Sequence, residues 1–506
     1  MRLSGKLANR NNSQITNRLL EIAPRLARKD ATLWGEDAKD EASVRLNWID
    51  LPNQSRDLLP QLDAVSAWAR SKKLENIVLC GMGGSSLAPE VIAKTYKKNL
   101  TVLDSTDPKQ IELAIPKNLS KSLFVIGSKS GSTIETASQK SFFEHLLVEN
   151  QLNPADHIVI VTDPGSPLHN DAKDKGYRVI TADPNVGGRF SALSAFGLVP
   201  AALIGVDVSE LLDDALVASE QFCLEGSLAI SIAAVLFESG NQFISFCEEN
   251  NPNPGLSDWI EQLIAESTGK NQTGRLPIVT QSLSEQQFGT TISFSPGDFD
   301  LVVEASLGAQ FILWEWVTAL LCYALEVDPF NQPNVTEAKE QTSNVLKLKQ
   351  SYIHLSEIKQ FEDSEFILYS NRKINSIADF FKVQMEYVAL MAYLTRGVDD
   401  SVISLRNLIS EKINKPTTFG WGPRFLHSTG QFHKGGQPNG GFIQITSEPI
   451  LDFAIAGADY TFNELITAQA IGDGIALRKR DYPFLQIHLK NRKSGIEKLR
   501  KIITEL

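Results

Sequence analysis

Five short β-rich runs, each followed by a loop and then by a segment with helical spacing, occupy residues 76–181. The runs lie at 76–80, 100–104, 122–128, 157–163 and 177–181, and segment 135–150 is typical of the helices between them. Short apolar strands separated by helices form a parallel sheet that helices cover on both faces. The pattern therefore predicts an α/β fold, and such sheets bind ligands at the carboxyl ends of their strands.

A second α/β block follows, with strands at 242–247 and in "PIVTQSL" and "LVVEA", and with the apolar helix "GAQFILWEWVTALLCYALEV". From about Leu346 the chain is more polar and helical, then rich in Gly and Pro at 419–441, and the strands "FIQIT" and "FLQIHL" come last. Boundaries near residues 210 and 345 predict four parts. These are an N-terminal helical segment at 1–55, a first, phosphate-binding domain at 56–210, a second domain at 211–345 and a C-terminal α/β extension at 346–506. For residues 346–415 we expect only helical packing.

Charge and composition exclude several classes of protein. With 506 residues and a formal net charge of −11, the chain is not expected to bind nucleic acid, although a local basic pocket remains possible. Its four cysteines form no CxxC pair, which favours thiols in a reducing cytoplasm. The first residues contain no apolar secretory region, and the apolar stretch 311–325 is interrupted by Glu315. We therefore expect a soluble cytoplasmic protein that does not bind a membrane.

The loop after the first of these strands combines glycines with hydroxyls. Gly81, Gly83 and Gly84 are followed by Ser85 and Ser86, so the third glycine of a dinucleotide fingerprint is missing. Asp104, at the end of the next strand, keeps a nucleotide site as a weak alternative, and no Gly-Lys-Ser/Thr supports a P-loop. Open backbone N–H groups, two hydroxyls and a helix N-terminus suit a compact anion.

A second cluster of hydroxyls follows the strand at 122–128. It consists of Ser128, Lys129, Ser130, Ser132 and Thr133, directly before a helix. Taken alone, the cluster is better explained as an N-cap, with Glu135 in the first helical turn. Two such clusters at the carboxyl ends of nearby parallel strands instead favour a shared phosphate site.

At this point the chain resembles sugar-isomerase domains and, more narrowly, the glucose-6-phosphate isomerase family. "GMGGSSLAP" and "SKSGSTIET" are similar to two of its segments, with Ala88 and Gly131 as departures, and "DPNVGGRFSALSAFGLVPAALIG" is similar to a third. The resemblance implies two parallel-sheet domains of three αβα layers plus the C-terminal α/β extension. It also implies isomerisation of glucose 6-phosphate and fructose 6-phosphate through an enediol, no metal or cofactor, and a homodimer.

Such a reaction needs a base and a cation beside the developing oxyanion. Glu266 lies in "QLIAESTGK", similar to the family's base motif, and Gln262 lies one helical turn before it. Arg189, preceded by Gly188, is the candidate electrostatic stabiliser because its guanidinium stays charged and offers a fork of donors. Without the resemblance, an exposed carboxylate near a helix end would be the better interpretation of Glu266.

Lys339 and a histidine complete the predicted site. "DPFNQPNVTEAK" resembles the family's terminal signature, which implies that Lys339 acts near the ring oxygen of the sugar; by itself it could be a solvated lysine, like Lys347 or Lys349. No histidine lies between Glu266 and Lys339. His427 and His433 lie further on, in "FLHSTGQFHKGG", which resembles a displaced histidine motif of the isomerase half of bifunctional transaldolase–isomerase proteins. We favour His427 for ring opening and keep His433 as a second substrate contact.

The predicted roles divide the site into catalytic and substrate-binding residues. Glu266, Arg189, Lys339 and His427 are the predicted catalytic residues. The predicted substrate contacts are Gly84, Ser85, Ser86, Ser128, Lys129, Ser130, Ser132, Thr133, Gly188, Gln262 and His433. Two alternatives stay open: an isomerase that also accepts mannose 6-phosphate, and a sugar-phosphate-binding regulator without chemistry. The remaining histidines, at 145, 157, 169, 354 and 488, are expected to be structural or exposed.

Overall fold

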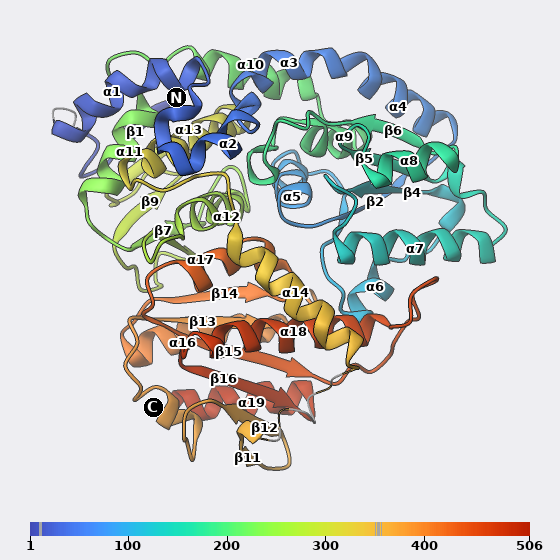
Figure 1. Cartoon of the computed structure of the whole chain (residues 1–506), viewed down its shortest axis with the longest axis vertical. Helices are drawn as coiled ribbons and strands as arrows, with labels where there is room; N and C mark the ends of the chain where they lie inside the picture. Colours follow the sequence, from blue (N-terminus) through green and yellow to red (C-terminus); the bar gives the residue numbers. More distant parts are fainter. Residues whose placement is uncertain (10–12, 350, 352–354, 356) are drawn as a thin grey trace.

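The computed structural model of the chain describes residues 1–9, 13–349, 351, 355 and 357–506. Figure 1 shows three sheets with helices packed around them: the first domain at the right, the second at the upper left and the C-terminal extension below. All three sheets consist mainly of parallel strands, which confirms the predicted α/β class. His354 falls outside the described residues.

The first domain holds a five-stranded sheet in the order β3-β2-β4-β5-β6, and every pair in it is parallel. Gly81, the last residue of β2, pairs with Gly127, the last residue of β4, so the loops after both strands leave the sheet side by side. The elements are α4 (Leu59–Ser71), β2 (Asn76–Gly81), α5 (Leu87–Thr95), β3 (Thr101–Leu103), α6 (Pro108–Ala114), β4 (Ser122–Gly127), α7 (Ile134–Glu149), β5 (Ile158–Thr162), α8 (Pro167–Asp174), β6 (Arg178–Thr181) and α9 (Ala195–Leu203).

The second sheet has the order β1-β10-β9-β7-β8. Strand β1 (Arg2–Ser4) pairs antiparallel with β10 at its edge, so the N-terminal segment, predicted to be helical, also supplies a strand to the second domain. Its helices begin with α1 (Gln14–Ala27), α2 (Glu36–Ser43) and α3 (Leu51–Gln54). The elements that follow the first domain are α10 (Val208–Ser219), α11 (Leu228–Glu238), β7 (Phe243–Cys247), α12 (Leu256–Thr268), β8 (Leu276–Thr280), β9 (Thr290–Ser293), β10 (Leu301–Glu304) and α13 (Leu307–Ala324).

The C-terminal extension forms a third sheet, in the order β11-β12-β16-β15-β13-β14. The expectation of helical packing alone for residues 346–415 is wrong, because three of these strands lie there. The elements are α14 (Pro333–Lys347), β11 (Lys359–Glu362), β12 (Phe366–Ser370), α15 (Ile377–Phe380), β13 (Tyr387–Ala392), α16 (Ser404–Ile413), β14 (Thr417–Trp421), α17 (Gly430–Gly435), β15 (Gly440–Ser447), α18 (Phe462–Lys479), β16 (Phe484–Leu489) and α19 (Arg492–Thr504).

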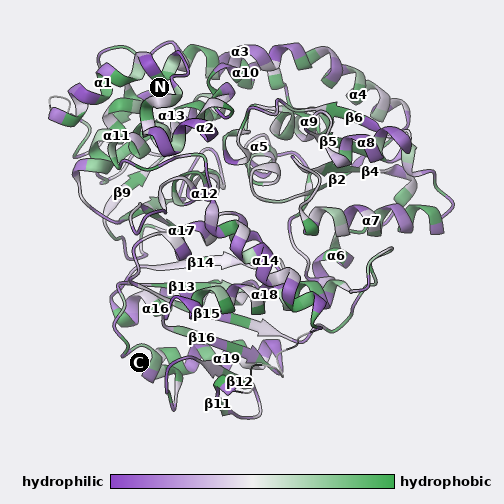
Figure 2. Ribbon diagram, in the orientation of Figure 1, coloured by the Kyte–Doolittle hydropathy of each residue, from purple (hydrophilic) through white to green (hydrophobic). Residues whose placement is uncertain are grey.

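Helix α13 illustrates how the core is built. It is long and apolar enough to cross a membrane by length and composition, yet 94% of that window is buried inside the fold. Its residues pack with those of α10 and α11 in one large hydrophobic cluster that also reaches the first domain. Figure 2 shows the same division, with hydrophobic strands inside and helices such as α4 and α7 that mix hydrophobic and hydrophilic residues.

The C-terminal extension contacts the first domain through the segment that follows β3. The Arg424 guanidinium lies 2.5 Å from a carboxylate oxygen of Asp104. The Thr106 hydroxyl donates to the Gln469 side chain at 2.6 Å. The Asp107 carboxylate accepts from the Thr395 hydroxyl at 2.7 Å. These contacts bring the Gly- and Pro-rich histidine segment to the carboxyl edge of the first sheet.

Candidate active site

The two hydroxyl-rich loops meet at the carboxyl edge of the first sheet. The Ser85 side chain lies between the strand ends, since a Cβ on Gly81 would be 3.0 Å and a Cβ on Gly127 3.4 Å from Ser85 Cβ. Ser86 is fully buried and its hydroxyl donates to the Gly83 carbonyl at 3.1 Å, which is a turn-stabilising contact. In the second loop, the exposed Ser130 and Ser132 hydroxyls are 2.6 Å apart.

Of the other polar residues in the second loop, some stabilise the loop itself and one keeps its hydroxyl available for a ligand. Ser128 is buried and its hydroxyl accepts from the Gly131 N–H at 3.2 Å, so it shapes the loop. Thr133 precedes α7 as its N-cap but makes no side-chain cap bond, so its half-buried hydroxyl is not used for capping. Lys129 forms an ion pair with Asp163 at 2.7 Å and also donates to the Pro184 carbonyl.

A third loop, after β6, packs directly on the first. A Cβ on Gly84 would lie 1.8 Å from the Gly188 carbonyl oxygen, so the two backbones approach as closely as glycine permits. A Cβ on Gly83, which has a φ of +55°, would lie 2.8 Å from Gln262 Nε2. The glycines that the sequence placed in this turn therefore allow contact with both the arginine loop and helix α12.

Arg189 is buried beside Gly84 and its guanidinium joins several segments. One Nη1 contact is an ion pair with Glu266 at 2.9 Å, and another is a hydrogen bond to Gln332 at 3.0 Å. Its Nε donates to the Ser267 hydroxyl at 2.9 Å. Nη2 donates to the carbonyls of residues 329 and 331 at 2.7 and 3.1 Å. Arg189 is therefore a buried side chain with several partners, and the alternative of a surface salt bridge is excluded.

Glu266 and Gln262 lie one turn apart on α12 and face the same way. Gln262 Nε2 donates to Glu266 at 3.1 Å and to the backbone carbonyl of His427 at 2.8 Å. Both side chains are buried, and the alternative of an exposed carboxylate for Glu266 is excluded. The predicted base is therefore linked to the predicted stabiliser on one side and to the histidine loop on the other.

Lys339 and His427 line one cavity of about 210 Å³, which we call the histidine cavity. Ser132 of the second hydroxyl loop lines it as well, together with Glu135 and Gln469. A neighbouring cavity of about 320 Å³, the arginine cavity, is lined by Arg189, Lys129 and Gly188. Both cavities border the first turns of α14. Lys339 is thereby distinguished from Lys347 and Lys349, which line neither cavity.

Two functional candidates in the histidine cavity were not predicted from the sequence. The carboxylate of Glu135 lies 2.9 Å from His427 Nε2 and accepts from Gln469 Nε2 at 2.7 Å. Burial opposes its ionisation, but the charge of His427 and the hydrogen bond with it lower the pKa of Glu135 below its usual value. Glu135 had been interpreted as a first-turn residue of α7, and only its distance to the histidine reveals a second role.

Lys270 is a third residue that the sequence left without a role. It is buried, and its ammonium donates to the Asp328 carbonyl, at the start of the segment that accepts from Arg189. Burial, followed by the positive charge of Arg189, lowers the pKa of Lys270 to about 7. The spacing Glu-Ser-Thr-Gly-Lys could have suggested this proximity.

The structure does not bring His433 to either cavity. Its ring lies among aromatic rings, with centroids 5.9 Å from Phe425 and 5.3 Å from Phe442, and neither ring nitrogen has a hydrogen-bond partner in the described structure. Burial, and then the charge of Lys434, lower the pKa of His433 well below its usual value. The substrate contact predicted for His433 therefore finds no support in this packing, and His427 is the histidine that reaches the site.

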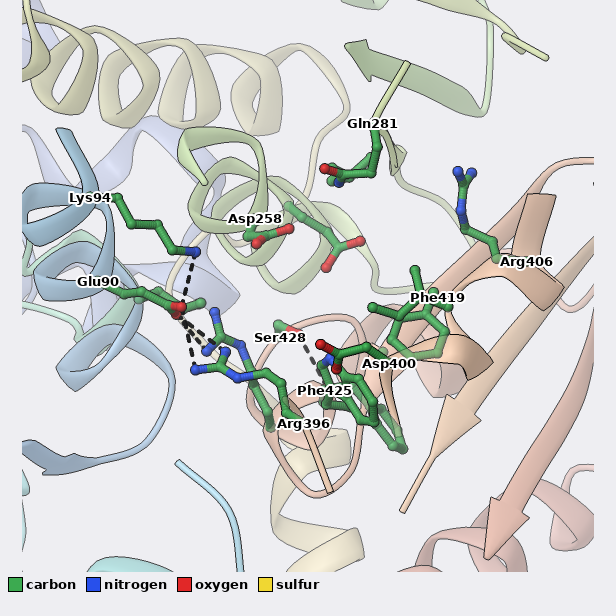
Figure 3. Close-up of a pocket in the computed structure, with 17 residues that line it drawn as sticks. Glu90, Lys94, Asp258, Gln281, Arg396, Asp400, Arg406, Phe419, Phe425 and Ser428 are labelled. Carbon is green, nitrogen blue, oxygen red and sulfur yellow. Dashed lines mark hydrogen bonds and ion pairs between the residues drawn. The ribbon is translucent and has the colours of Figure 1, made fainter. Parts of the chain in front are cut away.

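A larger cavity, of about 430 Å³, is lined by Asp258 and Glu261 of α12 (Figure 3). Residues of the first domain, the second domain and the C-terminal extension all line it. Glu90 of α5 forms ion pairs there with Lys94, Arg396 and Arg424. None of the predicted site residues lines it, and its paired charges join the C-terminal extension to the first domain. Among the described residues, no cluster of three or more His, Cys, Asp or Glu side chains could hold a metal ion.

The fold is α/β, with three mainly parallel sheets, and the candidate site lies where loops of the first domain meet helix α12 and the histidine segment of the extension. Residues 37–248 match the model of the phosphoglucose isomerase family. The match contains the two hydroxyl loops and Arg189, whereas Glu266, Lys339 and His427 lie beyond it. In architecture, the chain is similar to a glucose-6-phosphate isomerase from Chlamydia trachomatis, with a TM-score of 0.54 and 18% identity over 66% of this chain and 86% of that one.

The amino-acid sequence is also similar to those of glucose-6-phosphate isomerases from other organisms. The chain is 34% identical over 218 residues to the glucose-6-phosphate isomerase of Campylobacter jejuni, which is 39% of this chain and 51% of that protein. It is 29% identical over 388 residues to that of Mycoplasmopsis pulmonis, covering 60% of this chain and 90% of the relative. The chain thus spans about half of the first relative and nearly all of the second.

Proposed function

We propose that this protein is an aldose–ketose isomerase that interconverts glucose 6-phosphate and fructose 6-phosphate through an enediol. The observation that supports the proposal most is the convergence of five separate segments. The loops after β2 and β6 touch at Gly84 and Gly188, and the end of β4 lies beside Ser85 of the β2 loop. Arg189 of the β6 loop pairs with Glu266, and Gln262 links helix α12 to the histidine loop of the extension. Fold likeness alone would not specify a reaction, because function depends on the site.

The geometry supports a division of roles. Ser85, Ser130, Ser132 and Thr133 offer hydroxyls to the phosphate, with Lys129 nearby. His427 and Lys339, in one cavity, open the sugar ring. Glu266 moves the proton between C2 and C1, and Arg189 stabilises the enediolate, since a fixed guanidinium in a site closed to water stabilises developing charge strongly. In this structure the Arg189 guanidinium forms an ion pair with Glu266. When substrate binds, its oxygens take the place of the Glu266 carboxylate beside Nη1 of Arg189.

Exchange of Glu266 for glutamine tests this assignment. Glu266→Gln keeps the shape of the side chain but removes the base, so turnover falls by at least about a thousandfold. Binding of glucitol 6-phosphate, which cannot isomerise, should stay within about threefold when measured by calorimetry. Glu261→Gln, on the same helix but facing the cavity of Figure 3, is the matched control and keeps full activity. Near-normal turnover of Glu266→Gln would refute the role of Glu266.

The substrate assay also separates the alternatives. Equal rates with mannose 6-phosphate and glucose 6-phosphate would indicate a dual-specificity isomerase, and binding of glucitol 6-phosphate without any turnover would indicate a regulator. We further propose a place in glycolysis and gluconeogenesis, a cytoplasmic location, no metal or cofactor, and a homodimer. Light scattering at micromolar concentration tests the homodimer, and turnover after treatment with a chelator tests the metal.

A further inference from the structure

Gln469 of α18 contacts the predicted catalytic histidine through Glu135. Its side chain is 2% exposed and lines the histidine cavity. Nε2 donates to the same Glu135 oxygen that His427 Nε2 contacts, at 2.7 Å. The Glu135 carboxylate is ionised, because its pKa is lowered, so it can only accept hydrogen bonds. His427 Nε2 therefore carries a hydrogen and donates it to Glu135.

The orientation of the Gln469 amide is fixed from its other end. The Thr106 hydroxyl is fully buried and donates to Gln469 Oε1 at 2.6 Å. A flipped amide would direct its oxygen at the carboxylate of Glu135, which is repulsive, and would leave no acceptor for Thr106. The chain of bonds thus runs from Thr106 through Gln469 and Glu135 to His427.

We propose that Gln469 is a positioning residue for ring opening. The inference rests on the proposed isomerase function. It means that the C-terminal extension supplies two residues to ring opening, His427 and the glutamine that positions it. Gln469 holds the Glu135 carboxylate in place by its hydrogen bond, and the carboxylate in turn orients the ring of His427 through Nε2. A residue that orients a catalytic group through a second group affects turnover more than substrate binding.

The first test compares kinetic constants. Gln469→Leu should lower kcat about tenfold and leave KM within about twofold. In a His427→Ala background the same exchange should cost nothing further, because the residues act as one unit. Thr106→Val should give a smaller loss than Gln469→Leu, and Thr106→Ser, which restores the hydroxyl, should recover it. Gln444→Leu is the control, since Gln444 also donates, at 3.0 Å, to a buried carboxylate of the extension, that of Asp473.

The second test uses pH. Gln469→Glu has the same shape but places an acceptor against the Glu135 carboxylate at neutral and higher pH, so kcat relative to wild type should be lowest there. As the pH falls, the introduced carboxyl takes up a proton and can donate again, so the ratio should rise. A general loss of stability would not give this pH profile.

A third measurement does not depend on turnover. The Nε2–H proton of His427, identified by its absence in His427→Ala, should be visible by NMR in histidine-labelled protein and shift or broaden in Gln469→Leu but not in Gln444→Leu. Additive kinetic losses, an unchanged NMR signal or an equal effect of Gln444→Leu would overturn the inference. Wild-type protein without isomerase activity would instead overturn the proposed function, and the NMR comparison would still decide the role of Gln469.

Discussion

The Arg189 guanidinium contacts several segments of the second domain at once. It contacts two side chains of α12, and in the segment between α13 and α14 it contacts the Gln332 side chain and two carbonyls. An ammonium group has fewer donors and no planar fork, so it cannot make these contacts at once. Arg189 therefore links the first domain to the second at the edge of the proposed site.

Exchange of this arginine for lysine tests that statement. We expect Arg189→Lys to lower kcat by about a hundredfold, because the enediolate loses a positioned partner, while a positive charge remains. The rate should be measured beside Arg178→Lys, whose guanidinium stacks 4.2 Å from the Trp68 ring centroid, remote from the cavities. A kcat of Arg189→Lys within threefold of wild type would contradict the role.

Gly84 is the second decisive residue at this scale. We expect Gly84→Ala to separate the β2 and β6 loops or to unfold them, at a cost of about 3 kcal/mol or more, since overpacked sites cannot relax past backbone. The melting temperature measures the effect. Gly188→Ala, where an added Cβ meets nothing within 4 Å, should leave the melting temperature unchanged. Equal melting temperatures of the two variants would show that the close approach is not needed.

Helix α12 has two functional faces. Gln262 and Glu266 point toward the proposed site, whereas Asp258 and Glu261 line the cavity of Figure 3. Burial, followed by the charge of Asp258, raises the pKa of Glu261 well above its usual value. Across the same cavity, Glu90 is also desolvated, but Arg424, Arg396 and Lys94 lower its pKa.

These two glutamates should respond to the same substitution with opposite signs. Glu261→Gln should stabilise the protein by about 1 kcal/mol at pH 7, because the fold disfavours ionisation of this carboxyl and glutamine does not ionise. The gain should disappear as pH falls below about 4.5, where the carboxyl is neutral in both states. Glu90→Gln should destabilise by about 3 kcal/mol at pH 7, since it breaks a buried ion pair.

Denaturant titrations at several pH values measure both effects. The contribution of Glu90 is present above the pKa of an unfolded glutamate and is lost as pH falls toward its lower folded value. The cost of Glu90→Gln should therefore shrink in acid. Destabilisation by both substitutions at pH 7 would contradict the assigned charge environment.

At the level of elements, the sequence predicted best where local pattern and tertiary surroundings agree. Strands β2 to β6 and β7 were predicted because short apolar runs alternate with helices. The run "YVALMA" of β13 was missed, since an apolar run of six residues does not distinguish a strand from a buried helix. Strand β14 was missed within a Gly- and Pro-rich stretch, and Gln469 lies in no motif, so only the packing of α18 reveals it.

The whole molecule depends on how the extension docks on the first domain. The Arg492 guanidinium lies 3.5 Å from the Asp107 carboxylate, 2.9 Å from the Asp399 carboxylate and 2.7 Å from the Thr395 hydroxyl. It therefore joins the segment that follows β3 to the domain of the third sheet. This contact lies beside Thr106, at the start of the bond chain to His427. We therefore expect docking and the geometry of the histidine cavity to be coupled.

Removal of the charge at Arg492 tests the coupling. Arg492→Met should lower stability by about 3 kcal/mol, because it leaves buried carboxylates unpaired, and should reduce kcat more than the affinity for glucitol 6-phosphate. Arg500→Met, at an exposed position of the same helix, is the control and should change neither. Loss of stability with unchanged kcat would show that docking and catalysis are independent.

The histidine, its positioning glutamine and the docking arginine all follow the phosphate loops in the chain. During synthesis on the ribosome, the phosphate-gathering half therefore exists before the half that opens the ring. On the proposed function, a product of premature termination or of carboxyl-terminal proteolysis retains the predicted phosphate loops but lacks His427, Gln469 and Arg492. We expect such a fragment not to convert hexose phosphate.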